Sequence, residues 1–377
     1  MLTRKERMLR SINFEPVDRI PRMLAYPTAT LSKYGNKLIS IASKYPSDVI
    51  FWGDSYVFRP KNNIDSNNNY NYYWTEPWIS IPNFNPDDFQ LICSPTYQTG
   101  IFKDSWGCVW ENRVEGLQGL IKKSPLAEWA QLKDYEPPDP DLYSEWGRID
   151  WDFVKNSLNY IKDTEFVLGS GVRLWERLHF LRGYENAMMD VADNSDELLT
   201  LIEIITDYNI KYIKNWIKAG VDGISFSDDW GTQESLMISP NQWRKIFKPC
   251  YKRMFNVLRN EGRQVFFHSD GNINSIIPDL IEIGATILNL QTELNGIDNL
   301  REKCLGKVCI SFQVDRQNAL PFFNDSELKN YIKDISKNLS INYSGCLLEC
   351  FFMPDVPIGN ILAACEQTEQ LVGLLKQ

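Results

Sequence analysis

An alternation of short β-branched runs with longer amphipathic stretches extends through most of the sequence, and it limits the fold more than any other feature. Such alternation is typical of βα units that build a parallel sheet. We predict eight strands: Ile20–Leu24, Asp48–Trp52, Phe166–Gly169, Gly223–Ser227, Gln264–His268, Thr286–Leu290, Val308–Phe312 and Cys346–Cys350. Helical patterns separate most of them: Asp196–Lys218, Pro240–Asn260, Ile273–Ile283, Asp325–Leu339 and Ile358–Leu375. This arrangement favours an α/β fold of the closed (β/α)8 TIM barrel type over an open sheet.

The strands are unevenly spaced, because residues 54–163 form a long insertion between the second and third strands. We treat the chain as a single barrel domain over residues 1–377, since no linker to a second domain is recognisable. Within the insertion, the tract Asn62–Asn71 is expected to be a surface loop. The segment Asp104–Trp110 is expected to be a strand of a β-hairpin that packs over the barrel mouth.

Composition excludes several classes of protein. The net charge of −9 argues against binding to nucleic acid or to anionic membranes. The sequence has no apolar run of about 18 residues or more, so we expect no membrane span. The first residues, Met1–Arg7, lack the apolar stretch of a signal peptide. The 8 Cys have no paired spacing, which favours reduced thiols and a cytoplasmic protein.

Active sites of such barrels lie at the carboxyl ends of the strands. Asp228 and Asp229 follow the fourth strand and should alternate in direction, so we expect only one of them to face inward as a base, metal ligand or hydrogen-bond acceptor. They are catalytic candidates, and the neighbouring Trp230 is a candidate for substrate binding. The alternative is that the acids cap a helix and form a solvated turn.

His268 and Asp270 end the fifth strand two positions apart, so both side chains can face the same side. Together they could hold zinc, or Asp270 could orient His268 as an acid–base group. The alternative is a core histidine that a neighbour satisfies by hydrogen bonding. The second histidine, His179, falls in an apparent helix beside arginines and is expected to be structural.

The last three strands also end in polar residues. Gln291 and Gln313 could line the pocket or cap the helices that follow. Glu349 and Cys350 should point to opposite faces of the eighth strand, so one of them is expected inside as a metal ligand. The alternative for Cys350 is that it is a small buried apolar residue.

Four groups of segments follow one another along almost the whole chain in the order that a known family shows: Thr3–Arg7 with Asp18–Pro21, Asp222–Gln233 with Ile238–Pro240 and Phe247–Pro249, His268–Asn272 with Ile277–Ala285, and Pro354–Pro357 with Asn360 and Ile361. As a set they resemble the uroporphyrinogen decarboxylase (URO-D) superfamily. The resemblance implies an enzyme of one of two kinds.

True decarboxylases of this superfamily remove acetate carboxyls from uroporphyrinogen without a cofactor. Their N-terminal run continues into Met-Arg-Gln-Ala-Gly-Arg, whose arginines hold substrate carboxylates. Here Arg19 to Arg22 begins similarly, but Met23 to Pro27 lacks that glutamine and both arginines. Arg22 remains a candidate for substrate binding, while decarboxylation of a tetrapyrrole or smaller polycarboxylate becomes the alternative function.

The other branch contains methyltransferases that work with corrinoid proteins, several of which bind zinc through a His-x-Cys-Gly segment and a distant Cys. His268 matches the histidine, Cys350 falls near the distant cysteine, and Asp270 stands in place of the middle ligand. His268 and Cys350 would then bind zinc, with Asp270 or Glu349 as a further ligand. The resemblance therefore implies a methyltransferase of anaerobic metabolism. It would move a methyl group between a small methylated donor and a corrinoid protein or a thiol or folate acceptor. Zinc and a homodimer are also implied, and a non-catalytic binding barrel is the third possibility.

Overall fold

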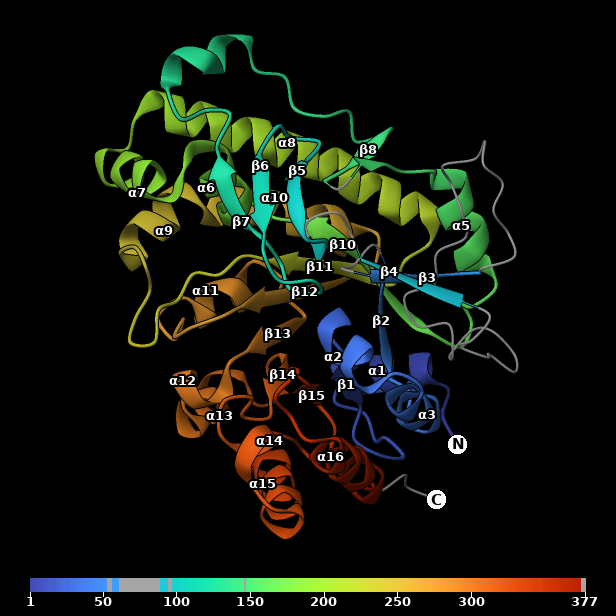
Figure 1. Cartoon of the computed structure of the whole chain (residues 1–377). Helices are drawn as coiled ribbons and strands as arrows, with labels where there is room; N and C mark the ends of the chain where they lie inside the picture. The colour runs from blue at the N-terminus through green and yellow to red at the C-terminus, as the bar shows by residue number, and fades with distance from the viewer. Residues whose placement is uncertain (53–55, 61–88, 94–96, 146, 374–377) are drawn as a thin grey trace.

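The computed structural model describes residues 1–52, 56–60, 89–93, 97–145 and 147–373, and the predicted loop Asn62–Asn71 lies outside them. Eight parallel strands form one barrel sheet (Figure 1), in the order β1-β15-β14-β13-β12-β11-β10-β2. These strands are β1 Arg22–Ala25, β2 Val49–Trp52, β10 Phe166–Val172, β11 Gly223–Ser227, β12 Gln264–Ser269, β13 Ile287–Leu290, β14 Cys309–Gln313 and β15 Cys346–Phe351. The prediction of an α/β TIM barrel is confirmed.

The barrel closes between β1 and β2 through Asp48 rather than through a full strand ladder. The backbone N–H of Asp48 donates to the carbonyl of Arg22 over 2.8 Å, and the Asp48 carboxylate accepts the Arg22 backbone N–H over 2.9 Å. Arg7 and Arg19 form ion pairs with the same carboxylate at 2.7 and 2.6 Å. Because these cations surround it, the buried Asp48 can stay ionised, and its pKa is lowered despite its burial.

The first helix, α1 (Arg4–Ile12), plugs the amino-terminal end of the barrel. Thr3 caps the helix and Glu6 completes a capping box, as the sequence predicts. The helix buries Met8 and Ile12 against inward residues of the strands, which are Met23, Val49, Phe166, Leu168, Phe266, Ile287, Cys309 and Leu347. This apolar layer fills the bottom of the barrel, so polar inward residues are confined to its carboxyl-terminal end.

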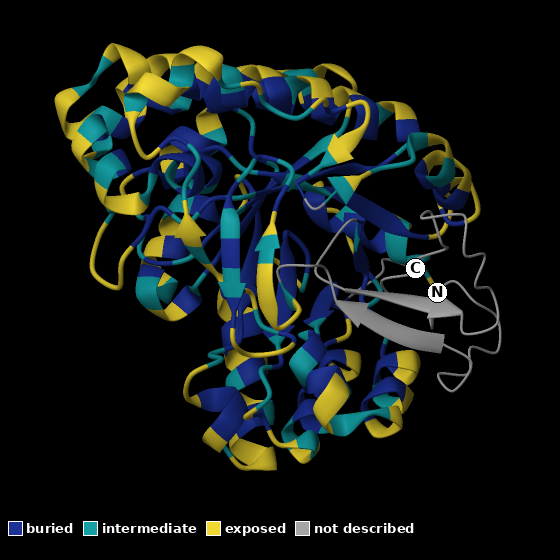
Figure 2. Ribbon diagram, turned by 45° about the horizontal axis from the view of Figure 1, so that its top comes forward, coloured by how far each residue is buried: buried dark blue, intermediate teal, exposed yellow. Residues whose placement is uncertain are grey.

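Helices surround the sheet and turn their apolar faces toward it (Figure 2). They are α2 Thr28–Tyr34, α3 Asn36–Lys44, α5 Trp151–Asn159, α6 Trp175–Arg182, α7 Tyr184–Asp193, α8 Asp196–Ala219, α9 Pro240–Ile246, α10 Lys248–Asn260, α11 Ile277–Glu282, α12 Thr292–Asn295, α13 Ile297–Cys304, α14 Ala319–Phe322, α15 Asp325–Asn338 and α16 Ile358–Gln370, with a 3-10 helix at Trp129–Asp134. None of the described helices is long and apolar enough to cross a membrane.

Small antiparallel sheets occupy the region between β2 and α5. They comprise β3 Tyr56–Pro60 with β4 Phe89–Cys93, β5 Gly100–Lys103 with β6 Val109–Asn112 and β7 Leu120–Lys123, and β8 Tyr143–Ser144 with β9 Gly147–Arg148. The prediction of a strand over Asp104–Trp110 is wrong, because most of this segment is the turn between β5 and β6. Asp104 builds that turn by accepting the backbone N–H groups of Trp106 and Cys108.

Asp104 also anchors the hairpin sheet to the barrel. Its carboxylate forms a 2.8 Å ion pair with the buried Arg177 of α6, whose guanidinium also binds Glu145 at 2.8 Å. All three side chains are buried, so a cation paired with two carboxylates joins the hairpin turn, the segment near β8 and the barrel wall. This network holds the hairpin sheet near the carboxyl ends of the strands.

Candidate active site

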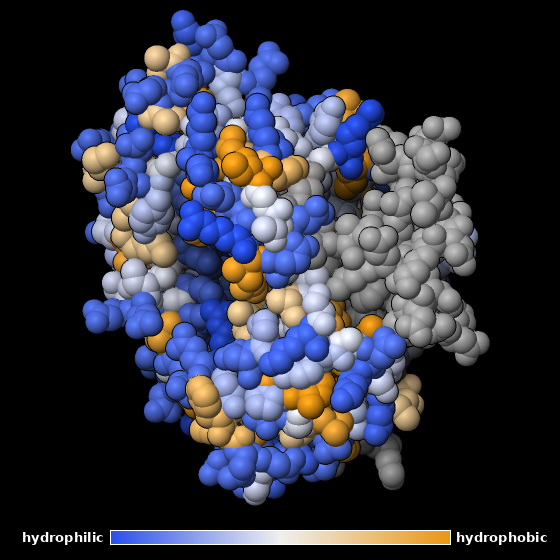
Figure 3. All heavy atoms as spheres, viewed as in Figure 1, coloured by the Kyte–Doolittle hydropathy of each residue, from blue (hydrophilic) through white to orange (hydrophobic). Residues whose placement is uncertain are grey.

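A cavity of about 270 Å³ occupies the carboxyl-terminal end of the barrel. Its walls come from inward residues of the strands and from the loops after them: Met23, Ala25, Phe51, Tyr97, Glu145, Ser170, Gly171, Arg173, Ser225, Ser227, Phe266, His268, Asn289, Gln313, Arg316, Glu349 and Phe351. We call this the inner cavity. Figure 3 shows a hollow with hydrophilic walls that opens on this face of the molecule.

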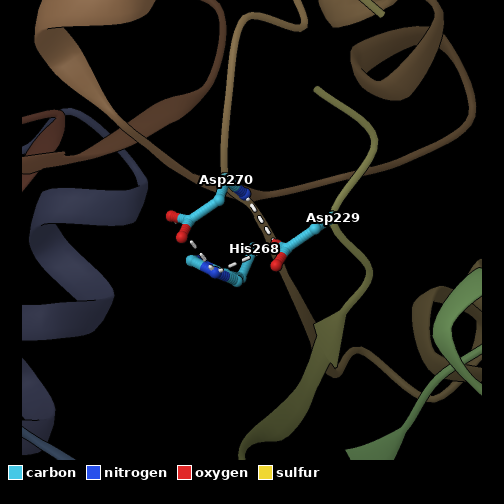
Figure 4. Close-up of side chains that lie close together, drawn as sticks. All are labelled: Asp229, His268 and Asp270. Atoms are coloured by element: carbon cyan, nitrogen blue, oxygen red, sulfur yellow. Dashed lines mark hydrogen bonds and ion pairs between the residues drawn. The ribbon is translucent and has the colours of Figure 1, made fainter. Parts of the chain in front are cut away.

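Three side chains predicted from the sequence meet at the rim of the inner cavity. His268 Nε2 lies 3.5 Å from Asp229 Oδ1 and 3.7 Å from Asp270 Oδ1 (Figure 4). One ligand atom from each residue lies within 4.8 Å of the others, and no other such group of His, Cys, Asp and Glu occurs among the described residues. Asp270 Oδ1 is buried and accepts no hydrogen bond within the described part of the chain. A buried acceptor without a donor is unfavourable unless a cation or water binds it.

Two loops hold these acids together through a close backbone contact. Gly231 lies two residues after Asp229 and Gly271 directly follows Asp270, and a Cβ on Gly271 would lie 2.2 Å from the Gly231 carbonyl carbon. Gly271 also has a positive φ of 82°, which favours glycine. The Asp270 backbone N–H then donates to Asp229 Oδ1 over 2.8 Å. The two glycines thus let both carboxylates approach the same histidine.

Asn289 on β13 fixes the tautomer and orientation of His268. His268 Nδ1 lies 2.5 Å from Asn289 Oδ1, which can only accept, so Nδ1 carries the hydrogen. The Asn289 amide is oriented in turn because its Nδ2 donates to Glu349 at 2.5 Å and to Ser311 at 2.9 Å. His268 Nε2 is therefore left to face the two aspartates.

The charges around His268 favour its protonated form. Burial opposes protonation, but Asp229, Asp270 and Glu349 outweigh it and raise the pKa of His268 above its ordinary value. A cation at the rim would meet the same negative potential. The site is therefore suited to a proton or to a metal ion on Nε2.

On β15, Glu349 faces the inner cavity and Cys350 points to the opposite side. Burial raises the pKa of Glu349, although hydrogen bonds from Asn289 and Gln313 oppose this. Cys350 is fully buried, and burial together with the nearby Cys365 raises the pKa of its thiol well above the ordinary value. The structure therefore does not bring the Cys350 sulfur to His268, and Glu349 reaches His268 only through Asn289.

On β11, the structure also separates the adjacent aspartates. Asp228 is fully buried and accepts the backbone N–H groups of Leu174 and Glu176 at 2.8 and 2.9 Å, together with the Tyr251 hydroxyl at 2.7 Å. It thereby satisfies the first turn of α6, which is the capping role weighed as the alternative. Burial raises its pKa to about 6 despite these hydrogen bonds. Of the two candidates, Asp229 is the one at the rim.

Trp230, Arg22 and Gln291 do not line the inner cavity. Trp230 is fully buried behind the barrel wall and stacks on Trp175. Arg22 points outward and donates to Thr368 over 2.9 Å, while its neighbours on β1 line the cavity. Gln291 accepts the backbone N–H of Gly271 over 2.8 Å, so it supports the loop that carries Asp270. Gln313 does line the inner cavity, as predicted.

Sequence reasoning missed the two arginines of the inner cavity. Arg173 follows β10 and pairs with Glu145 at 3.4 Å and also with Glu176. Burial raises the pKa of Glu176 to about 7, opposed by Arg173 and reinforced by Asp229. Arg316 follows β14 and binds Asp270 Oδ2 at 2.8 Å. Both arginines come within a few residues of a strand end, which is the signal that could have identified them.

The sequence itself identifies the family. Residues 120–370 match the family described as Uroporphyrinogen decarboxylase (URO-D). The chain belongs to this family. A relative named uroporphyrinogen decarboxylase, from Christiangramia forsetii, is 22% identical over 243 residues, which are 61% of this chain and 67% of the relative.

A solved structure supports the fold of this URO-D family member. A methyltransferase from Methanosarcina mazei superposes with a TM-score of 0.62 over 98% of this chain and 99% of its own, at 16% identity. A B12-independent methionine synthase from Shewanella sp. W3-18-1 gives a TM-score of only 0.40 over 73% of this chain and 75% of its own, at 12% identity. The first likeness bears on the fold alone, and the second is too low to support an argument.

Proposed function

We propose that this URO-D family barrel is a metal-dependent methyltransferase, in which Asp229, His268 and Asp270 hold zinc. It would move a methyl group between a small methylated donor and a corrinoid protein or a thiol or folate acceptor. The observation that carries the proposal is the convergence of three ligand atoms at the strand ends, two of them 3.5 and 3.7 Å from His268 Nε2. The full-length similarity to the Methanosarcina mazei methyltransferase supports it.

These residues fit a zinc ion in number, type and spacing. Catalytic zinc sites usually have three protein ligands and one open position, and nitrogen with carboxylate oxygen is a common set. Zinc–ligand bonds of about 2.0–2.2 Å place neighbouring donor atoms about 3.3–3.6 Å apart in a tetrahedral site. The two distances from His268 Nε2, 3.5 and 3.7 Å, are close to that spacing. Asp270 Oδ1, which lacks a donor, is oriented toward the same point.

Neighbouring groups hold each proposed zinc ligand through hydrogen bonds or an ion pair. Asn289 keeps the Nε2 lone pair of His268 free, Arg316 binds the second oxygen of Asp270, and the Asp270 backbone N–H holds Asp229. Such outer contacts orient ligands and set their basicity. When bound, zinc would act as a Lewis acid that activates a thiol or polarises a methyl donor. Glu176, with a pKa of about 7, can hold a proton near the site.

The decarboxylase alternative has weaker support from this site. Uroporphyrinogen carries eight carboxylates and needs several available cations. Arg19 is committed to Asp48, and Arg22 to Glu369, outside the cavity. Arg173 and Arg316 do line the inner cavity, but both already pair with carboxylates. Release of carbon dioxide from uroporphyrinogen by the purified protein would restore this alternative.

The test is methyl transfer from free methylcobalamin to homocysteine or tetrahydrofolate, followed by the visible spectrum of the cobalamin. The zinc-loaded wild type is expected to demethylate it, and the H268A variant to lose most of that rate. C350A is the matched control, because Cys350 points away from His268, and it is expected to keep the wild-type rate. A wild type inactive with both acceptors, or full activity in H268A, would overturn the proposal.

A further inference from the structure

A second, larger cavity adjoins the inner one. Its volume is about 830 Å³, within the range of about 300–1,000 Å³ that small-molecule sites occupy. Six residues line both cavities, which therefore share a wall: Met23, Ala25, Phe51, Tyr97, Arg316 and Phe351. A ligand in the larger cavity would therefore lie beside the inner cavity that His268 lines. We call this larger space the outer cavity.

The wall of the outer cavity is mostly apolar. Apart from the shared residues, it is formed by Leu24, Tyr26, Pro27, Val49, Leu117 and Met353, with a few uncharged polar neighbours. Only two of the described lining residues are charged, Arg316 and Asp355. Such a wall favours a ligand with an apolar body, because burial of apolar surface is the main source of affinity it can offer.

Arg316 is the charged residue among the six that line both cavities. One terminal nitrogen binds Asp270 at 2.8 Å, and the guanidinium lies 5.9 Å from the centre of the Phe351 ring. Its other nitrogens donate no hydrogen bond to any described residue, and about 28% of the side chain is exposed. A guanidinium has five N–H donors in a planar fork that matches a carboxylate. It can therefore bind a second anion while it keeps Asp270.

We infer that the small-molecule substrate has an apolar body seated in the outer cavity and a single carboxylate bound by Arg316. This inference rests on the proposed function, since it names the substrate class of the same site. A polycarboxylate is disfavoured because, apart from Arg316, the described lining residues of the outer cavity offer no cation to its other carboxylates.

The test uses an isosteric pair of probes, 2-naphthoate and 2-naphthamide, titrated by calorimetry into metal-free protein. The wild type is expected to bind the carboxylate more tightly than the amide. R316Q is expected to weaken only the carboxylate, by about tenfold to a hundredfold, the range for losing a charge-assisted hydrogen bond. R113Q, which alters an exposed arginine on the hairpin sheet, is the matched control and should change neither affinity.

A second variant tests the location. M353W fills part of the outer cavity and should weaken both probes alike. Equal affinities of the wild type for the two probes, no binding of either, or an unchanged carboxylate affinity in R316Q would overturn the inference, and so would M353W that binds both normally. Failure of the proposed function would show instead as a protein that does not bind zinc. The titration is performed without metal and is independent of that result.

Discussion

Replacing Asp228 by Asn is expected to change how the stability of the protein depends on pH. Asp228 has a pKa of about 6 in the folded protein, against an ordinary value of 3.8, because burial penalises its charge. As pH rises from about 4 to 6, the unfolded chain loses this proton before the folded protein does. Ionisation of Asp228 therefore lowers the free energy of unfolding across that window, by about 3 kcal/mol in total.

The asparagine variant lacks this penalty but loses a contact. Its side-chain oxygen, in the place of Asp228 Oδ1, can still accept the backbone N–H groups of Leu174 and Glu176, while its amide nitrogen would replace Oδ2, the acceptor of the Tyr251 hydroxyl. One lost hydrogen bond costs about 1 kcal/mol. D228N should thus be about 1 kcal/mol less stable than the wild type below pH 4, and about 2 kcal/mol more stable above pH 6.

Urea unfolding of both proteins at a series of pH values measures this difference in stability. Because the other titratable groups are the same in both proteins, their contributions cancel in the difference. D298N, on a fully exposed side chain, is the control for replacing an aspartate in general. If the wild type and D228N differ by the same amount at every pH, Asp228 does not carry a buried charge.

Two further predictions concern residues that hold the three rim side chains, Asp229, His268 and Asp270, in position. N289L removes the acceptor that orients His268 and should lower the zinc affinity about 10- to 100-fold without unfolding the protein. Chelator competition measures the affinity, and circular dichroism checks the fold. Unchanged affinity would contradict the orienting role of Asn289. G271A places a Cβ against the Gly231 backbone at a positive φ. It should lower the free energy of unfolding, measured by thermal denaturation, by about 3 kcal/mol or more. G359A, whose Cβ would meet nothing within 4 Å, should leave the stability nearly unchanged; equal effects of the two would contradict the close contact.

The barrel could be predicted from the sequence because its strands and helix caps are each specified by residues that lie close together in the chain. Each barrel strand is a short run with clear flanks, and the predicted Gly223–Ser227 has the bounds observed for β11. The capping box of Thr3 and Glu6 similarly set the start of α1. Asp104–Trp110 was misassigned because its apolar side chains imitate a strand, whereas Asp104 binds the local backbone and closes a turn.

The direction of side chains at the strand ends could not be predicted to the same extent. Alternation shows that Glu349 and Cys350 face opposite sides, but not which faces inward. That choice depends on pairing across strands distant in sequence, where Glu349 aligns with Gln313 of β14. Asp228 and Asp229 were ambiguous for the same reason, and the partner of Asp228, the amino end of α6, lies more than 50 residues earlier.

The central claim is that Asp229, His268 and Asp270 form one cation site, and calorimetric titration of the purified, metal-free protein with zinc tests it most directly. We expect one zinc site per chain in the wild type and in C350A. Binding should be lost in H268A and strongly weakened in D229N and D270N, because only these three variants change donor atoms at the rim. Loss of zinc in C350A with retention in D229N would contradict it, since the site would then require the sulfur on the far side of β15.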